Sequence, residues 1–236
     1  MILKFTGFPF RRRPGRSAAF TRMELIVVLV VAAFVVLLVL LWPPLSVVNR
    51  KAQQRSCLSN LKQIGTAFQL WSTDHNDLFP MQVSTDEDGA LEPVLRGEAF
   101  RVFQVMSNEL NTPKILVCPA DDRLIAFSFQ SMLPAGATGP AFTGNSNVNY
   151  FVGVDAKRAA PASWLAGDGN LTIKGQAVGP SLLTLTNRPP VGWTPARHQG
   201  SGNLLFADGS AQRLSSRSLS ASLATNLPTA TRLTIP

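Results

Sequence analysis

The sequence has few of the residues that metal sites and catalytic sites use most. It contains two cysteines, two histidines and a single tyrosine in 236 residues. The cysteines, Cys57 and Cys118, and the two histidines do not have the spacing of a compact zinc motif. There is no Gly-x-Ser-x-Gly elbow, and no second acid is evident to complete a catalytic set of Ser201, His198 and Asp208. We therefore predict no enzyme activity, no catalytic residue, no metal ligand and no cofactor. We expect His198 to form a structural hydrogen bond across a hairpin.

Acidic residues are also few, with 14 Asp and Glu against 22 Lys and Arg. Small acidic clusters at 74/77, 86–88 and 121–122 are typical of solvated surface acids. A calcium site is the alternative, although no 12-residue calcium-loop pattern is present. Five basic residues precede Phe20 with no acid among them, so without residues 1–19 the net charge falls from +8 to +3. No basic stripe interleaved with aromatic residues remains after them, so we expect no nucleic-acid partner.

Charge is absent from residues 25–42, LIVVLVVAAFVVLLVLLW. A helix of 18 residues is about 27 Å long, enough to cross the hydrocarbon of a bilayer. The run is longer than the apolar core of a signal peptide, and no Ala-x-Ala cleavage site follows it. We therefore predict a single-pass helix that contacts membrane lipid. The basic leader indicates a cytoplasmic N-terminus and an extracytoplasmic domain at 45–236, although Arg50, Lys51 and Arg55 weaken this asymmetry.

Residues 17–28, SAAFTRMELIVV, resemble the N-terminus of type IV prepilins and type II secretion pseudopilins. The resemblance implies that a prepilin peptidase cuts between Ala19 and Phe20 and methylates the new amine. It also implies that Glu24 neutralises the Phe20 amine of a neighbouring subunit in a homo- or hetero-polymer of pilin-like subunits. In that family Gly usually precedes the cut, and an apolar residue usually occupies the position of Arg22. The implied setting is the cell inner membrane, in a type II secretion-like pseudopilus or a type IV pilus-like fibre.

The segment after the apolar run predicts an amphipathic helix over residues 45–75. Apolar residues recur there at spacings of three and four, and Pro43-Pro44 before them predict a kink or break. The turn-forming residues 74–77 predict the end of this helix. The chain therefore divides into a leader at 1–19, a transmembrane and assembly helix at 20–44, a globular domain at 45–214 and a tail at 215–236.

The rest of the domain alternates between short apolar runs and loops. We expect a helix over 91–110, strands at 115–117, 148–154 and 163–166, and loops at 134–147 and 175–195. Asp208-Gly209, within an alternating pattern at 203–214, predicts a tight hairpin. The tail predicts a helix near 216–224 and then a frayed end.

Four short motifs of the domain resemble those of prepilin-like proteins of planctomycetes and verrucomicrobia. They are His198-x9-Asp208-Gly209 and the segments CLSNLKQIG at 57–65, CPAD at 118–121 and LAGDG at 165–169. The resemblance implies an α+β, pilin-like fold in which one long N-terminal helix packs on a small antiparallel sheet with long loops. A membrane-anchored extracytoplasmic binding module that does not polymerise is the alternative.

An extracytoplasmic location also bears on the two cysteines, because disulfides persist outside the cytoplasm. We predict that Cys57 and Cys118 form a disulfide, and two buried free thiols are the alternative.

Overall fold

The computed structural model describes residues 21–133, 136, 138–226 and 230–236, and these residues belong to two units, Met1–Val47 and Val48–Pro236. The leader at 1–19 and the predicted cleavage site between Ala19 and Phe20 lie outside the described residues.

The first unit contains the N-terminal part of helix α1 (Arg22–Asp74). The helix begins with a reciprocal cap: the backbone nitrogen of Glu24 donates to Thr21 Oγ1 at 3.2 Å, and the backbone nitrogen of Thr21 donates to Glu24 Oε2 at 3.4 Å. The segment Arg22–Leu40 has a mean hydropathy of 3.2 and buries none of its residues, so it is long and apolar enough to cross a membrane once.

Of the predicted kink or break at Pro43-Pro44, the break is wrong, because the backbone of α1 is helical through both residues. A proline removes one backbone donor from a helix and crowds the preceding turn. Long helical segments lie on both sides of the pair, and the helix continues despite this local loss.

In the second unit, α1 is amphipathic, as predicted, and it ends at Asp74. Its buried stripe consists of Cys57, Leu61, Ile64, Gly65, Ala67, Phe68 and Trp71. The single helix expected over 91–110 is instead three short helices, α2 (Leu91–Leu95), α3 (Ala99–Val105) and α4 (Ser107–Leu110). Gly97, between α2 and α3, has a φ of +90° and turns the chain out of the helical path.

The centre of the second unit is a six-stranded sheet in which every neighbouring pair is antiparallel. Its strands, in spatial order, are β5 (Ser181–Thr186), β9 (Ala230–Ile235), β1 (Tyr150–Gly153), β2 (Trp164–Asp168), β7 (Ser201–Phe206) and β8 (Ala211–Ser215). A smaller antiparallel sheet contains β4 (Gln176–Ala177), β3 (Leu171–Ile173) and β6 (Val191–Trp193). The chain is therefore α+β, with an N-terminal helix followed by antiparallel sheets.

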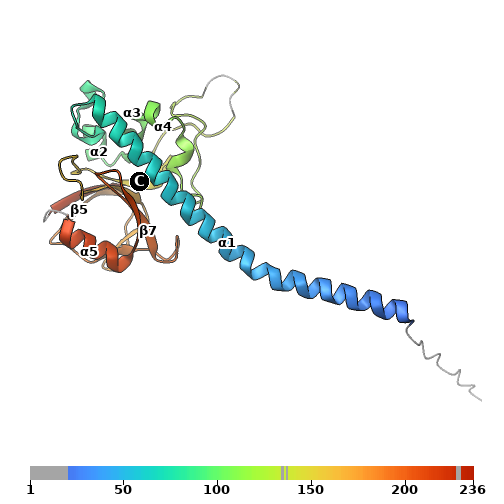
Figure 1. Ribbon diagram of the computed structural model, residues 1–236. Coiled ribbons are helices and arrows are strands. Elements are labelled where there is room, and N and C mark those ends of the chain that lie inside the picture. Colours follow the sequence, from blue (N-terminus) through green and yellow to red (C-terminus); the bar gives the residue numbers. More distant parts are fainter. Residues whose placement is uncertain (1–20, 134–135, 137, 227–229) are drawn as a thin grey trace, which may run out of the picture. The chain divides into compact units, whose positions relative to one another are not determined.

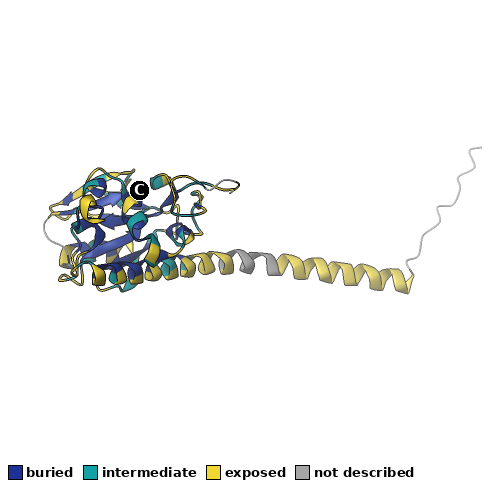
Figure 2. Cartoon of the chain, turned by 90° about the horizontal axis from the view of Figure 1, so that it is seen from above, coloured by how far each residue is buried: buried dark blue, intermediate teal, exposed yellow. Residues whose placement is uncertain are grey.

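Hydrophobic side chains cover both faces of the large sheet. Tyr150 and Val152 of β1 belong to the core shared with α1, whereas Phe151 between them belongs to a second core shared with helix α5 (Ser216–Asn226). Figure 1 shows α5 and the C-terminal half of α1 on opposite sides of these strands. Burial on both faces explains why the central strands read as continuous apolar runs (Figure 2).

The strands expected at 148–154 and 163–166 are confirmed as β1 and β2, and the hairpin at 203–214 is confirmed as β7 and β8. The strand expected at 115–117 is wrong: residues Pro113–Leu116 form a 3₁₀ helix, because Pro113 presets the first helical φ and Thr112 Oγ1 accepts a hydrogen bond from the backbone nitrogen of Lys114.

The C-terminal half of the domain has more strands than predicted. The expected loop at 175–195 contains β4, β5 and β6, since its prolines at 180, 189, 190 and 195 lie between strands rather than within them. The helix expected near 216–224 is confirmed as α5, but the frayed end is wrong, because β9 pairs with β5 on one side and β1 on the other.

Candidate functional site

The predicted disulfide is confirmed, and it lies at the centre of a buried polar cluster. Cys57 of α1 is bonded to Cys118, which follows the 3₁₀ helix Pro113–Leu116, and neither residue is exposed. The bond spans 61 residues of sequence and therefore fastens α1 to the loop that begins at Cys118.

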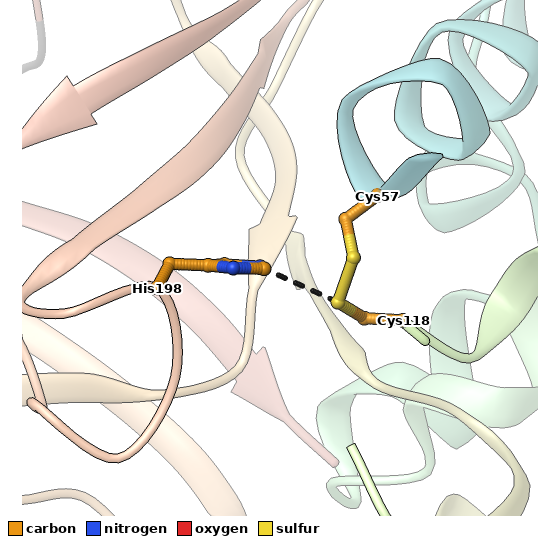
Figure 3. Close-up of side chains that lie close together, drawn as sticks. All are labelled: Cys57, Cys118 and His198. Carbon is orange, nitrogen blue, oxygen red and sulfur yellow. Dashed lines mark hydrogen bonds between the residues drawn. A yellow bond between two sulfur atoms is a disulfide. The ribbon is translucent and has the colours of Figure 1, made fainter. Parts of the chain in front are cut away.

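His198 points directly at this disulfide (Figure 3). Its Nε2 atom lies 3.3 Å from Cys118 Sγ and 3.7 Å from Asp168 Oδ2. His198, Gln199 and Gly200 all have positive φ, between +48° and +73°, and this left-handed turn precedes β7 and brings the imidazole into the interior. Glycine adopts such φ values freely, whereas His and Gln do so at a cost, so the surrounding packing holds this loop in place.

The prediction that His198 forms a hydrogen bond across the hairpin is wrong. The partner of its ring is Cys118, whereas the Asp208 carboxylate accepts a hydrogen bond from the backbone nitrogen of Ser210 at 2.7 Å within the hairpin turn. Strand β7 separates the two residues, and six residues of strand span about 20 Å. The hairpin itself forms as predicted, with Gly209 at a φ of +84°.

Asp168 lies at the end of β2 and is completely buried. Its Oδ2 atom accepts hydrogen bonds from the backbone nitrogen of Asn203 at 2.7 Å and from Asn203 Nδ2 at 3.0 Å. Its Oδ1 atom has no hydrogen-bond partner among the described residues. Burial raises the pKa of Asp168 to about 6, and the two bonds from Asn203 offset only part of this rise.

The pKa of His198 moves in the opposite direction for the same physical reason. Burial lowers it from 6.5, and the positive charges of Arg213 and Arg197 lower it further. At neutral pH the site therefore holds an uncharged imidazole beside a carboxylate and a disulfide.

A second set of charged groups fixes the loop that follows Cys118. The Asp121 carboxylate contacts the guanidinium of Arg197, which precedes His198, and accepts a hydrogen bond from Asn149 Nδ2. Arg123 donates to the backbone oxygens of Asn145 at 3.0 Å and Pro236 at 3.1 Å, and burial lowers the pKa of Arg123. These contacts hold the residues next to Cys118 and His198 in place.

Ser201 is not placed for nucleophilic chemistry with His198. Its hydroxyl donates to the backbone oxygen of His198 at 2.6 Å and accepts from Arg213 Nε and Nη2 at 3.1 and 2.7 Å. The third nitrogen of that guanidinium donates to Gln54 Oε1 at 2.7 Å and so connects the hairpin to α1. A serine with its hydroxyl bound in this way lacks the contact with a base that activates a nucleophile.

A pocket of about 320 Å³ lies beside the cluster. Its walls come from α1, from the loop after Cys118 and from the loop that carries His198, and they consist of Arg50, Gln53, Gln54, Pro119, Ala120, Asp122, Pro195, Ala196, Arg197, His198 and Gln199. The Nη1 atom of Arg197 is buried and has no hydrogen-bond partner among the described residues.

The acidic clusters take different local roles. Asp77 lies 2.9 Å from Arg158 Nη1, and Asp121 contacts Arg197, so these two carboxylates are paired with arginines. His75 lies at the end of α1, where its Nδ1 is 2.8 Å from the backbone oxygen of Trp71 and its ring stacks on the indole.

All four sequence motifs contribute a residue to this cluster, because Cys57, Cys118, Asp168 and His198 each come from a different motif. The sequence indicated the cysteine pair but not the contact of Cys118 with His198, nor the approach of His198 to Asp168. Asp168 could have been identified as a site residue because it ends the apolar run WLAGD, and a charged residue in a buried strand needs a partner. The chain matches no known family model, no curated protein and no solved structure.

Proposed function

We propose that this chain is a membrane-anchored, prepilin-like structural subunit that is processed between Ala19 and Phe20 and assembles into a pseudopilus or pilus-like fibre. One observation carries the proposal: the apolar segment Arg22–Leu40 begins with a carboxylate, Glu24, and none of its residues is covered by any other part of the described chain. Such a surface requires lipid or other copies of the same helix around it.

The Glu24 carboxylate has two possible uses, and the proposal depends on the second. The first is the helix cap with Thr21, which glutamine would also form. The second is ion pairing with the free amine of Phe20 on a neighbouring subunit, which requires the negative charge. An unpaired carboxylate inside a bilayer costs roughly 2.5–3.5 kcal/mol, and a partner amine offsets this cost and sets the register between helices.

The domain that follows the span is suited to a structural role. The disulfide and the contacts between Gln54 and Arg213 join α1 to other parts of the domain, so a force on the helix passes directly into the folded domain. This arrangement, in which a long helix packs on an antiparallel sheet, agrees with the pilin-like fold that the sequence motifs suggest.

The test combines processing with assembly. The full chain is expressed together with a prepilin peptidase, extracted from membranes and analysed by mass spectrometry and chemical crosslinking. We expect a mature start at methylated Phe20 and a ladder of crosslinked species. Glu24→Gln keeps the cap and removes the charge, so we expect it to stay in the membrane and lose the ladder. A chain that keeps its leader and remains a monomer contradicts the proposal, as does a Glu24→Gln ladder equal to the wild type.

A second candidate is the anchored binding module, and the pocket beside the cluster favours it. Arg50, Gln53 and Gln54 in its wall carry donors suited to an acidic polysaccharide. We expect such binding by the full chain in detergent to weaken at least several-fold in Gln53→Ala, whereas crosslinking would be unchanged. Failure of the wild-type chain to retain any acidic polysaccharide would exclude this candidate without affecting the first.

A further inference from the structure

Four side chains with metal-binding atoms meet in the buried cluster, although they lie far apart in the sequence. Cys57 comes from α1, Cys118 from the loop after the 3₁₀ helix, Asp168 from the end of β2 and His198 from the turn before β7. The Sγ atoms of both cysteines and a ring nitrogen of His198 lie within 4.8 Å of one another. Figure 3 shows that the imidazole edge faces the sulfur of Cys118.

We propose that, when Cys57 and Cys118 are thiols, this cluster binds one Zn²⁺ through the two sulfur atoms, His198 Nε2 and the Asp168 carboxylate. The inference goes beyond the assembly role and does not depend on it. Two thiolates, an imidazole and a carboxylate form a four-coordinate donor set that suits zinc.

Two of the distances between the proposed ligand atoms agree with tetrahedral coordination. Zinc bonds of about 2.0–2.3 Å place neighbouring ligand atoms about 3.3–3.8 Å apart. The Nε2 atom of His198 is 3.3 Å from Cys118 Sγ and 3.7 Å from Asp168 Oδ2, so His198 already lies at this spacing from two of its proposed co-ligands. Opening the disulfide lets the two sulfur atoms separate to the same distance, because they are then no longer bonded to each other.

An independent observation also indicates a cation here. Asp168 is completely buried, yet its Oδ1 atom has no hydrogen-bond partner among the described residues. A buried carboxylate oxygen without a partner is costly, and a metal ion would provide that partner. The two hydrogen bonds from Asn203 to Oδ2 hold the carboxylate in place in the manner of outer-shell contacts in zinc sites.

Binding changes only protons and coordination bonds. Each thiol loses its proton as its sulfur bonds to the ion, so one Zn²⁺ displaces two protons. A sulfur atom within a disulfide is not a thiolate, so the disulfide form and the zinc form exclude each other. Either form connects α1 to the loop at Cys118, and the zinc form also connects both to β2 and to the turn before β7.

The test uses the full chain in detergent, expressed under reducing conditions and purified without oxygen. Free thiols are counted, excess reductant is removed, and Zn²⁺ is titrated in competition with a chromophoric chelator. We expect one zinc per reduced chain with release of two protons, and none for the oxidised chain. Co²⁺ in place of Zn²⁺ should give thiolate charge-transfer absorption together with tetrahedral d–d bands.

Two variants localise the site. We expect His198→Ala to weaken zinc binding at least about tenfold, because even outer-shell partners of zinc ligands contribute that much. The matched control is His75→Ala, which removes the other histidine and should leave binding unchanged. The proposal is overturned if a reduced chain with two free thiols takes up no zinc, or if His198→Ala binds as tightly as the wild type. A reduced chain that unfolds and does not regain its near-ultraviolet circular dichroism on addition of zinc also overturns it.

Discussion

Glu92 is a half-buried residue whose carboxylate accepts three hydrogen bonds from the turn before α2. The hydroxyl and the backbone nitrogen of Thr85 donate to its Oε2 atom at 2.6 and 2.8 Å, and the hydroxyl of Ser84 donates to Oε1 at 2.9 Å. These bonds, chiefly that from the Thr85 hydroxyl, lower the pKa of Glu92 from 4.5 to about 2. The charged form is therefore favoured by folding.

This depressed pKa predicts a defined pH dependence. A carboxyl group whose pKa is lower in the folded state stabilises that state above its unfolded pKa, and the contribution is lost as pH falls through the folded pKa. We expect the stability difference between the wild type and Glu92→Gln to be full above pH 4.5 and to shrink between pH 4.5 and about pH 2. Urea unfolding of the full chain in detergent across this range measures it.

Thr85→Val provides the second arm of that experiment. It removes the largest of the three interactions, so we expect the pH-dependent part of the stability to decrease while the carboxyl group remains. The lowered pKa of Glu92 would be contradicted if the difference in unfolding free energy between the wild type and Glu92→Gln stayed constant from neutral pH down to pH 2.

Gly65 allows α1 to approach the hairpin closely. A Cβ atom at this position would lie 2.7 Å from Leu205 Cδ1 and 3.1 Å from the backbone oxygen of Gly209. The leucine side chain can move, but the backbone oxygen is held by the hairpin turn. Gly65→Val should therefore destabilise the domain by about 1–3 kcal/mol through overpacking.

The matched control for Gly65 is Gly179→Ala. No heavy atom lies within 4 Å of a Cβ built at Gly179, and no positive φ is recorded there. We expect the midpoint of thermal unfolding to fall clearly for Gly65→Val and to change little for Gly179→Ala. Equal midpoints for the two variants would mean that α1 does not pack closely on the hairpin.

At the scale of elements, β9 has the most consequential position because it lies between β5 and β1 in the large sheet. Its Leu233 is completely buried in the core shared with α5. We predict that Leu233→Ala costs about 2–5 kcal/mol, since it removes buried methyl groups and leaves a cavity. Thr186→Ala, at an exposed position of β5, should cost no more than about 0.5 kcal/mol in the same denaturant titration. Similar losses for both would show that β9 is not an internal strand.

Which elements could be predicted from the sequence depends on how local their signals are. Strands β1 and β2 are continuous apolar runs, and the β7–β8 hairpin carries Asp208-Gly209 at its turn, so each could be identified from a few adjacent residues. Strands β5 and β9 have weaker patterns, and each is stabilised by a partner about 50 residues away in the chain. Pairing of this kind is decided by tertiary packing rather than by propensity.

The candidate site also depends on contacts that only the folded chain makes. The pairing of Cys57 with Cys118 followed from the expected compartment, but the meeting of Asp168 with His198 depends on the register between β2 and β7. A shift of one residue in β2 would turn Asp168 to the opposite face of the sheet. Register is a property of the assembled sheet, so the contact could not be predicted from sequence spacing.

At the scale of the whole molecule, the apolar segment is the candidate membrane span of the chain. Residues 25–42 contain 15 Leu, Ile, Val and Phe residues. Each contributes about 0.3–0.6 kcal/mol to membrane insertion on this scale, so we expect insertion of the segment to be favourable by about 5–9 kcal/mol. A central arginine costs about 2.5–3.5 kcal/mol on the same scale, which is less than this margin.

These magnitudes predict that membrane association survives one central arginine and is lost only when several are introduced. Phe34→Arg alone should leave the full chain in the membrane pellet after alkaline extraction, because the remaining apolar residues outweigh one charge. The triple variant Val30→Arg, Phe34→Arg and Leu37→Arg should release the chain into the supernatant, because three central arginines cost about 7.5–10.5 kcal/mol and also remove three apolar contributions. A wild-type chain released by alkali would show that the segment does not span a bilayer. A triple variant that stays in the pellet would show that contacts outside residues 25–42 hold the chain at the membrane.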